Sequence, residues 1–277
     1  MRQKTVPVQQ LTSRQADVVE LVQLTDCHLF KEDSGKLLGL QTALSLNAVL
    51  DDVATLPAQD LLLATGDLSQ DGSPESYRRL RDGVNRFAMP AFWIPGNHDE
   101  PDVMATELTG GNWSAAKRIL IGNWQLILLD SMVPHRVYGK LLDDQLALLE
   151  QALREFPDRH ALVVLHHHPV PIDCFWLDTI RLNNPEPLLA LLQAHKGKSV
   201  VLWGHIHQAF DREQDGIRLL ATPSTCVQFK PNSESFQADT ESPGYRLLRL
   251  HVDGHIDTEV RRIDHMEFTV DYSVKGY

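Results

Sequence analysis

Five short apolar segments of this chain each run directly into polar side chains of the kinds that bind metal ions. The segments are predicted to be buried β-strands, and they cover residues 18–24, 61–64, 92–94, 161–165 and 200–203. The polar side chains that follow them are Asp26 and His28, Asp67, Asn97 and His98, His166, His167 and His168, and His205 and His207. If the strands share a sheet, these side chains gather at the carboxyl ends of its strands, where open α/β sheets bind their ligands.

The segments between these strands carry the signals of helices. Apolar residues recur at roughly helical spacing in residues 41–56, and Pro57 ends the pattern. Ser73-Pro74-Glu75 supplies a hydroxyl at the N-cap, a proline at the first helical position and an acid in the first turn of a helix that runs to about residue 87. Further helices are expected at 143–155 and 188–194. Strands that alternate with helices in this way are typical of a mainly parallel sheet.

The pattern changes after His207. Residues 217–221 and 245–263 are predicted to be strands, and Asp253-Gly254 is a strong hairpin signal within the second of them. We therefore expect a second, more antiparallel sheet. The predicted fold class is α/β, with two packed mixed β-sheets in a sandwich that is flanked by helices. We expect one domain over residues 1–277, in which 1–17 form a loose N-terminal arm and the chain from about residue 240 forms a β-hairpin and tail.

Composition narrows the classes of partner. The net charge of −11 argues against a nucleic-acid backbone, because a polyanion normally needs a basic surface. Three widely spaced cysteines, Cys27, Cys174 and Cys226, indicate neither a disulfide framework nor a thiolate zinc site. No apolar run approaches the ~20 residues that span a bilayer, and no signal-peptide core is present. We expect a cytoplasmic protein that binds neither nucleic acid nor membrane.

The spacing of the ligand-type residues predicts a centre for two metal ions. Residues two apart on an extended segment point the same way, so Asp26 with His28, and His205 with His207, can each reach one ion. Cys27, which then faces elsewhere, is predicted to pack in the core. Asp67 offers two oxygens, enough to bridge two ions. Asn97 and His166 would complete the ligand set of the second ion.

The charges of such a centre balance around a phosphodiester. Two divalent ions bring four positive charges, and the carboxylates of Asp26 and Asp67 remove two. The two positive charges that remain can be balanced by one hydroxide and one singly charged phosphodiester. Mixed nitrogen and oxygen ligands suit Fe²⁺ or Mn²⁺, with Zn²⁺, Co²⁺ or Mg²⁺ as alternatives, better than Ca²⁺.

In their order and spacing, Asp26-x-His28, Gly66-Asp67, Gly96-Asn97-His98-Asp99, His166 and Gly204-His205-x-His207 resemble the calcineurin-like binuclear metallophosphoesterases over about residues 18–210. Within that superfamily the chain is most similar to the bacterial class III 3′,5′-cyclic-AMP phosphodiesterases, through segments such as His166-His167-His168-Pro169 and Ala221 to Pro231. The resemblance implies that Asp26, His28, Asp67 and His207 hold one ion, and that Asp67, Asn97, His166 and His205 hold the other.

The activity implied by this resemblance is hydrolysis of 3′,5′-cyclic AMP to 5′-AMP by a metal-bridging hydroxide. His98 and Asn97 would be the catalytic residues, and His98 would assist the leaving oxygen. Substrate contacts are expected from Asn97, His98, His167, His207 and Trp176. The alternative is a broader phosphodiesterase or phosphomonoesterase with the same metals. A nuclease would need a basic groove, and a non-enzymatic scaffold would be expected to lack ligands.

Several neighbouring residues keep two interpretations. Trp176, Phe175 and Phe210 either close the core or stack on a base, and residues 225–230 either line the pocket or merely connect strands. The carboxylates of Asp99 and Glu100 either belong to a turn or helix start, or orient His98. Asp130 is predicted to be a turn residue. The chain is expected to be a monomer or a homodimer.

Overall fold

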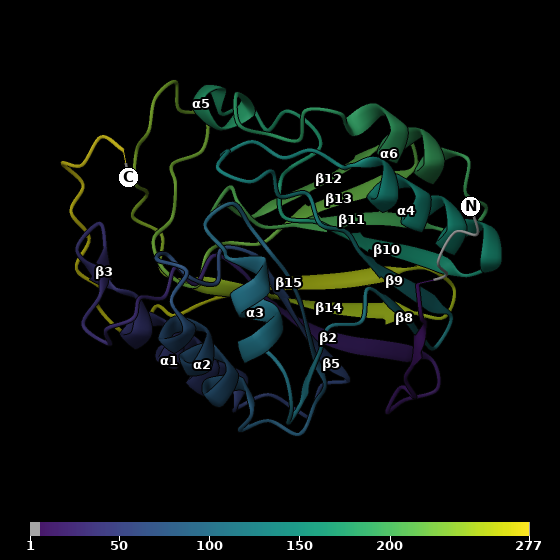
Figure 1. Ribbon diagram of the computed structural model, residues 1–277, viewed down its shortest axis with the longest axis horizontal. Coiled ribbons are helices and arrows are strands. Elements are labelled where there is room, and N and C mark those ends of the chain that lie inside the picture. Colours follow the sequence, from purple (N-terminus) through teal and green to yellow (C-terminus); the bar gives the residue numbers. More distant parts are fainter. Residues whose placement is uncertain (1–5, 277) are drawn as a thin grey trace.

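The protein is built from two β-sheets packed face to face, with helices on both outer faces (Figure 1). The computed structural model describes residues 6–276. The seven-stranded sheet has the order β1-β8-β9-β10-β11-β13-β12, and the six-stranded sheet has the order β15-β14-β2-β5-β6-β7. Their strands are β1 Gln9–Gln10, β8 Arg118–Ile121, β9 Trp124–Leu128, β10 His160–Val164, β11 Ser199–Trp203, β12 Phe210–Gln214, β13 Ile217–Ala221, β15 Ile256–Arg262, β14 Gly244–His251, β2 Val18–Leu24, β5 Leu61–Thr65, β6 Ala91–Ile94 and β7 Trp113–Ser114. A small hairpin, β3 Lys36–Leu37 with β4 Leu40–Gln41, stands apart from both sheets.

Three apolar layers hold this arrangement together. Alternate side chains of both sheets meet in the middle layer, among them Leu21, Phe92 and Leu162. The helices α1 Thr42–Val53, α2 Pro74–Val84 and α3 Pro101–Glu107 cover the six-stranded sheet, and α4 Asp143–Glu155, α5 Phe175–Asp178 and α6 Pro185–Gln193 cover the seven-stranded sheet. Because the parallel strands are buried on both faces, their sequences are almost continuously apolar, which is how they were recognisable.

Local sequence explains where several helices begin and end. Helix α2 starts after Ser73, whose hydroxyl accepts a hydrogen bond from the Ser76 amide, as expected, but it ends at Val84 rather than near residue 87. Helix α4 has the predicted bounds. Helix α6 begins at Pro185, three residues earlier than predicted, because a proline lacks the amide hydrogen that the first helical turn leaves unused anyway.

The expected pair of packed mixed sheets is confirmed, but two expectations about strand placement are wrong. The five strands that precede the ligand-type residues do not share one sheet: β2, β5 and β6 lie in the six-stranded sheet, and β10 and β11 in the seven-stranded sheet. The strands after His207 do not form a separate sheet either. Strand β13 pairs parallel with β11, whereas β14 pairs antiparallel with β2 and β15 extends that edge.

The described part of the N-terminal arm is attached to the body rather than loose. Gln9 and Gln10 pair parallel with β8, and the Arg14 amide donates to the Asp60 carboxylate. Residues 1–5 lie outside the described part of the chain. Within residues 6–276, none of the helices has the length and apolar character that crossing a bilayer would require. The single-domain expectation stays a prediction.

A buried glutamine joins the two sheets at the ends that carry the ligand-type residues. The Gln23 amide nitrogen donates to Thr65 Oγ1 at 2.8 Å and to the Trp203 carbonyl at 3.2 Å, and its oxygen accepts from the Thr222 hydroxyl. Gln23 and Thr65 belong to the six-stranded sheet, whereas Trp203 ends a strand of the seven-stranded sheet. The side chain therefore fixes the spacing of the sheets where their loops meet.

We predict that Gln23→Leu lowers the free energy of unfolding by about 1–3 kcal/mol, because it leaves buried hydrogen-bonding groups without a partner. Urea unfolding followed by circular dichroism measures the change. The exposed Gln214→Leu serves as the control and should leave the midpoint unchanged. An unaltered midpoint in Gln23→Leu would contradict the role of Gln23 as a link between the sheets.

Candidate metal centre

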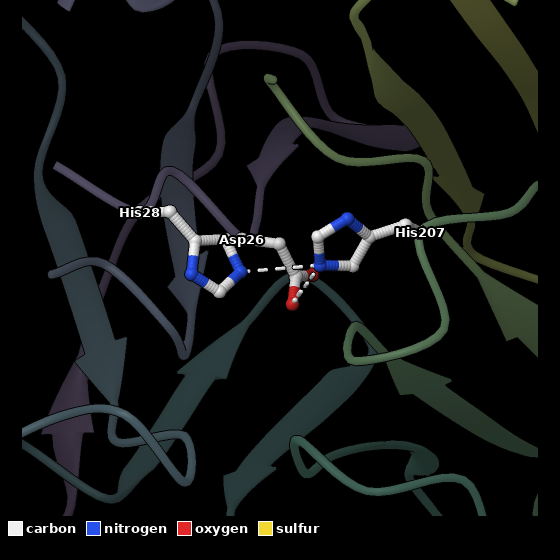
Figure 2. A group of neighbouring side chains, drawn as sticks. All are labelled: Asp26, His28 and His207. Carbon is white, nitrogen blue, oxygen red and sulfur yellow. Dashed lines mark hydrogen bonds and ion pairs between the residues drawn. The ribbon is translucent and has the colours of Figure 1, made fainter. Parts of the chain in front are cut away.

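The ligand-type residues come together at the carboxyl ends of both sets of parallel strands. Three groups have ligand atoms within 4.8 Å of one another: Asp26, His28 and His207; His28, Asp67 and His98; and Asp67, His166 and His205. Figure 2 shows the first group, in which the Asp26 carboxylate and the imidazoles of His28 and His207 converge, with His207 in contact with both of the others. Asp67 belongs to the other two groups, so its carboxylate lies between the two sides of the centre.

The backbone reaches this arrangement by a route that differs from the predicted one. Asp26, His28, Asp67, His205 and His207 all have positive φ, between 44° and 67°. They therefore do not lie on extended segments with alternating side chains, and that part of the prediction is wrong. Left-handed conformations are uncommon outside glycine and cluster where function requires them. Here these backbone turns bring the five side chains into the clusters described above.

Each of the two carboxylates is held by hydrogen bonds from the chain and has one oxygen near an imidazole nitrogen. Asp26 Oδ2 accepts from the Thr25 hydroxyl at 2.7 Å and from the His205 amide at 3.0 Å, while Oδ1 lies 3.1 Å from the same amide and 3.3 Å from His207 Nε2. Asp67 Oδ1 accepts from the His98 amide at 2.8 Å, while Oδ2 lies 3.2 Å from His166 Nε2. Both side chains are buried.

The outer nitrogen of each of the four clustered histidines has an acceptor. His28 Nδ1 lies 2.6 Å from Gln70 Oε1, and His166 Nδ1 lies 2.8 Å from the Thr65 carbonyl. The other pairs are His207 Nδ1 with the Val227 carbonyl at 2.7 Å and His205 Nε2 with the Ile180 carbonyl at 3.2 Å. Because a carbonyl can only accept, these outer nitrogens carry the hydrogens. The inner nitrogen of each imidazole, when the ring is neutral, then presents a lone pair to the centre, as in histidine ligands of metals.

These donors fit divalent ions. His28 Nε2 and His207 Nε2 lie 3.1 Å apart, close enough for one cation to bind both. Among the described residues, the buried Asn97 Oδ1 has no hydrogen-bond partner, and the buried His166 Nε2 has only its 3.2 Å contact with Asp67 Oδ2. Buried polar atoms are normally paired, so both are candidate ligand atoms. Nitrogen and oxygen donors of this kind suit transition metals.

The two carboxylates shift the protonation of the residues around them. Burial by itself raises the pKa of Asp67, but the His166 and His98 imidazoles outweigh it and hold the pKa well below the usual value. Burial lowers the pKa of His166, yet the Asp67 charge outweighs burial and raises this pKa to about 9. For His28, burial dominates and lowers the pKa to about 3. The chain thus keeps both carboxylates charged, and a metal ion would displace a proton from His166.

Asp99 ties together the two loops that carry Asp67 and Asn97. Its carboxylate accepts from the amides of Leu68, Ser69 and Gly96, and from the Tyr77 hydroxyl at 3.0 Å. Burial, followed by the nearby Asp67 charge, raises its pKa to about 7. These contacts give Asp99 a role in positioning the two loops, and a role in orienting His98 stays a prediction. Glu100 caps helix α3, and its amide donates to the same Tyr77 hydroxyl.

The loops approach so closely that some positions exclude any side chain. A Cβ atom at Gly96 would overlap the Asp67 carboxylate, and one at Gly204 would overlap the Thr25 hydroxyl and the Asp26 carboxylate. The same reason therefore explains the glycine in each of the pairs Gly66-Asp67, Gly96-Asn97 and Gly204-His205. The missing Cβ lets loops from different strands contact one another.

The remaining predicted site residues lie around this centre at different depths. His98 is partly exposed, and its ring meets the His28 ring edge to face at 5.1 Å. His167 is buried behind the clustered histidines, with its ring 4.7 Å from the His205 ring and its Nδ1 2.8 Å from Ser131 Oγ. His168 is also buried, with Nε2 3.5 Å from the Asp178 carboxylate. Substrate contact by His167 stays a prediction.

The aromatic residues of the surrounding loops divide between core and surface. The Trp176 ring meets the edges of Phe229 and Phe236 and is half-buried. Phe175 is exposed, and Phe210 packs near Trp203. These contacts show packing for Trp176 and Phe210; base stacking stays a prediction.

Residues 225–230 do more than connect strands. The Thr225 amide donates to the Thr25 carbonyl, and the Val227 carbonyl holds His207. Cys27 is buried in the core, as predicted. Asp130 accepts from the Met132 amide two residues on, as a turn residue does.

Sequence reasoning missed several residues that hold the centre in place. Gln70 and Ser131 orient His28 and His167, and Asp178 faces His168. Gln70 lies three residues after Asp67, which is a hint only once the loop geometry is known. The other acceptors are the backbone carbonyls of Thr65, Ile180 and Val227. The types of side chain in the sequence cannot predict which backbone carbonyls take this role.

Comparison with known proteins places the chain in a described family. The calcineurin-like phosphoesterase family matches residues 20–209. A 3′,5′-cyclic adenosine monophosphate phosphodiesterase, CpdA, from Pseudomonas aeruginosa is 50% identical over 94% of this chain and 95% of that protein. The Escherichia coli K12 protein of the same name is 45% identical over 94% of this chain and 95% of its own length. A 3′,5′-cyclic-nucleotide phosphodiesterase from Nostoc is 40% identical over 88% and 92% of the two chains.

Solved structures support the fold. A dimetal phosphatase from Danio rerio has a TM-score of 0.60 at 14% identity and covers 90% of this chain and all of its own. A purple acid phosphatase from yellow lupin has a TM-score of 0.64 at 14% identity, over 93% of this chain and 54% of its own. At this identity the likeness concerns the fold alone. Together with the side-chain clusters, the family and fold support a centre for two divalent metal ions.

We predict that Gln70→Leu weakens metal binding at the His28 side by about 10- to 100-fold, because His28 loses the acceptor that orients its ring. Titration of metal-depleted protein with Mn²⁺ in a calorimeter measures the affinity. Gln70→Glu keeps an acceptor oxygen and should bind more tightly than Gln70→Leu, and the exposed Gln193→Leu should match the unmodified chain. Equal affinities in all variants would contradict the orienting role.

Proposed function

The chain belongs to the calcineurin-like phosphoesterase family, and on that premise we propose that it hydrolyses 3′,5′-cyclic AMP to 5′-AMP at a dinuclear metal centre, lowering intracellular cyclic AMP. The observation that carries the proposal is the pair of buried carboxylates, Asp26 and Asp67, each held by hydrogen bonds from the chain and each with one oxygen facing imidazole nitrogens. Relatives of 40–50% identity named as phosphodiesterases of 3′,5′-cyclic AMP or cyclic nucleotides support this substrate class.

We assign the donors to two ions according to the clusters. Asp26, His28, Asp67 and His207 would hold the first ion, and Asp67, Asn97, His166 and His205 would hold the second, with Asp67 shared by both sets. The clusters around Asp26 and around His166 support the division. We propose Fe²⁺ or Mn²⁺ as the native ions, because the donors are imidazole nitrogens together with carboxylate and amide oxygens.

The chemistry follows from the charges. When bound, two divalent ions supply Lewis acidity at the phosphoryl oxygens and a hydroxide near neutral pH. Asp26 and Asp67 supply two negative charges. The two positive charges that remain balance the hydroxide and the singly charged phosphodiester. During hydrolysis the oxygen of the hydroxide forms a bond to phosphorus, the bond between phosphorus and the 3′ oxygen breaks, and that oxygen takes up a proton.

His98 is the residue that we propose donates this proton. Its amide donates to Asp67, which fixes its backbone beside the centre, while its ring is partly exposed and can meet substrate. General acid catalysis of this kind contributes about 10²- to 10⁴-fold to rate. We propose that Asn97, His98 and His207 contact the phosphate side of the substrate, and that His167 and Trp176 shape the wall around it.

A broader phosphodiesterase or phosphomonoesterase remains the second candidate function. The solved structures with similar folds include phosphatases, so the fold alone does not select a cyclic nucleotide. We further propose that the protein acts in the cytoplasm on a small-molecule substrate, as a monomer or homodimer and as a single domain.

The decisive experiment measures hydrolysis by metal-depleted protein after Fe²⁺, Mn²⁺ or Zn²⁺ is added back. The substrates are 3′,5′-cyclic AMP, 3′,5′-cyclic GMP, 2′,3′-cyclic AMP and p-nitrophenyl phosphate. We expect metal-dependent release of 5′-AMP, with kcat/KM for 3′,5′-cyclic AMP at least tenfold above that for the aryl ester. Activity on p-nitrophenyl phosphate alone would keep the metal centre and overturn the cyclic-nucleotide assignment.

We predict that His98→Ala lowers kcat by about 10²- to 10⁴-fold while two metal ions remain bound, because the leaving oxygen loses its proton donor. Metal content is measured by atomic emission on the same sample. A substrate with a more acidic leaving group, bis(p-nitrophenyl) phosphate, should lose less activity, since it needs no proton. Loss of metal together with activity would show that His98 holds the centre together instead.

A further inference from the structure

The imidazole of His207 lies flat against the ring of Phe229. Their ring centroids are 4.0 Å apart and the planes differ by only 11°. Phe229 is 1% exposed, so its ring is not available to a substrate base. Such a close parallel contact places one face of the imidazole against a fixed surface.

Two further contacts from the same short segment hold His207. Its Nδ1 lies 2.7 Å from the Val227 carbonyl, and its own carbonyl accepts from the Phe229 amide at 3.3 Å. The hydrogen bond to Val227 sets the rotation of the ring within its plane, and the Phe229 ring sets the tilt of that plane. Both are needed to direct Nε2 towards Asp26 Oδ1, which lies 3.3 Å away.

Phe229 is itself held by two other aromatic rings. Trp176 and Phe236 meet it edge to face at 5.2 Å and 5.3 Å, and they lie 5.3 Å from each other. The Trp176 indole nitrogen donates to Ser233 Oγ at 3.2 Å, and the Phe175 amide donates to the Ser233 carbonyl. Helix α5 and residues 229–236 thus form one packed unit, and its innermost ring is Phe229.

We propose that Phe229 is a positioning residue for the metal centre, fixing the ring plane of His207, and that Trp176 supports it from behind. The inference rests on the proposed role of His207 as a ligand of the first ion. It assigns to Trp176 a structural contribution to metal binding in place of contact with the base.

The test is metal binding by intact protein that carries Phe229→Leu. Mn²⁺ is titrated into metal-depleted protein, and the bound ion is counted by calorimetry and electron paramagnetic resonance. We expect binding at one of the two sites to weaken about 10- to 100-fold, as for loss of other groups that orient a ligand, while the other site is little changed. At saturating Mn²⁺, kcat should largely recover, which a lost catalytic group would not allow.

Control variants separate positioning from general loosening of the core. Phe229→Tyr keeps the aromatic face and should retain tight binding. Phe92→Leu removes the same ring volume from the core between the sheets and should lower Tm without selective loss of one ion. Trp176→Ala should weaken the same site as Phe229→Leu, though less.

Several outcomes would overturn the inference. These are unchanged Mn²⁺ affinity in Phe229→Leu, equal weakening of both sites in Phe229→Leu, or a raised KM for cyclic AMP in Trp176→Ala with unchanged metal binding. If the unmodified protein binds two ions but does not cleave cyclic AMP, the substrate assignment alone fails, and the affinities of the variants still decide the inference. If it binds no ion, both proposals fail.

Discussion

Two buried carboxylates that face imidazole nitrogens are the constraint on which the rest of the structure depends. Asp26 and Asp67 are fully buried, and burying an unpaired charge is costly. Amides and a hydroxyl donate to these carboxylates, and His166, whose pKa burial lowers but the Asp67 charge raises to about 9, pairs with Asp67 while it is protonated. A divalent cation would displace that proton, and the side chains already lie where they can bind one.

Holding these groups in place determines much of the surrounding backbone. Five ligand-type residues adopt left-handed conformations, and glycines at 96 and 204 allow loops from different strands to touch. Such strain persists only where neighbouring structure enforces it. Gln23 and Asp99 both help to hold this backbone in place. Gln23 links the two sheets through its hydrogen bonds to Thr65 and Trp203, and Asp99 links two loops through the amides of Leu68 and Gly96.

The sequence was sufficient to predict which ligand-type side chains come together, but not which groups hold those side chains in place. Strand ends and donor types identified Asp26, Asp67 and the histidines, since those signals are local. That the strands divide between two sheets could not be read from them, because either arrangement brings carboxyl ends together. The positive φ of His28 or His207 was equally hidden, as it arises from contacts between distant loops. The groups that orient the imidazoles are mostly backbone carbonyls, and every residue has one.

Selectivity for a substrate must come from segments that differ among proteins with this fold. Structures of only 14% identity share the architecture and include phosphatases of other kinds, so the architecture does not itself choose a cyclic nucleotide. The loops after β10 and after β13 are among those that border the centre, and they meet where Trp176 contacts Phe229. Phe229 contacts His207 in turn. A substitution in either loop that changes substrate contacts can therefore also shift the ring that packs against His207, the proposed metal ligand.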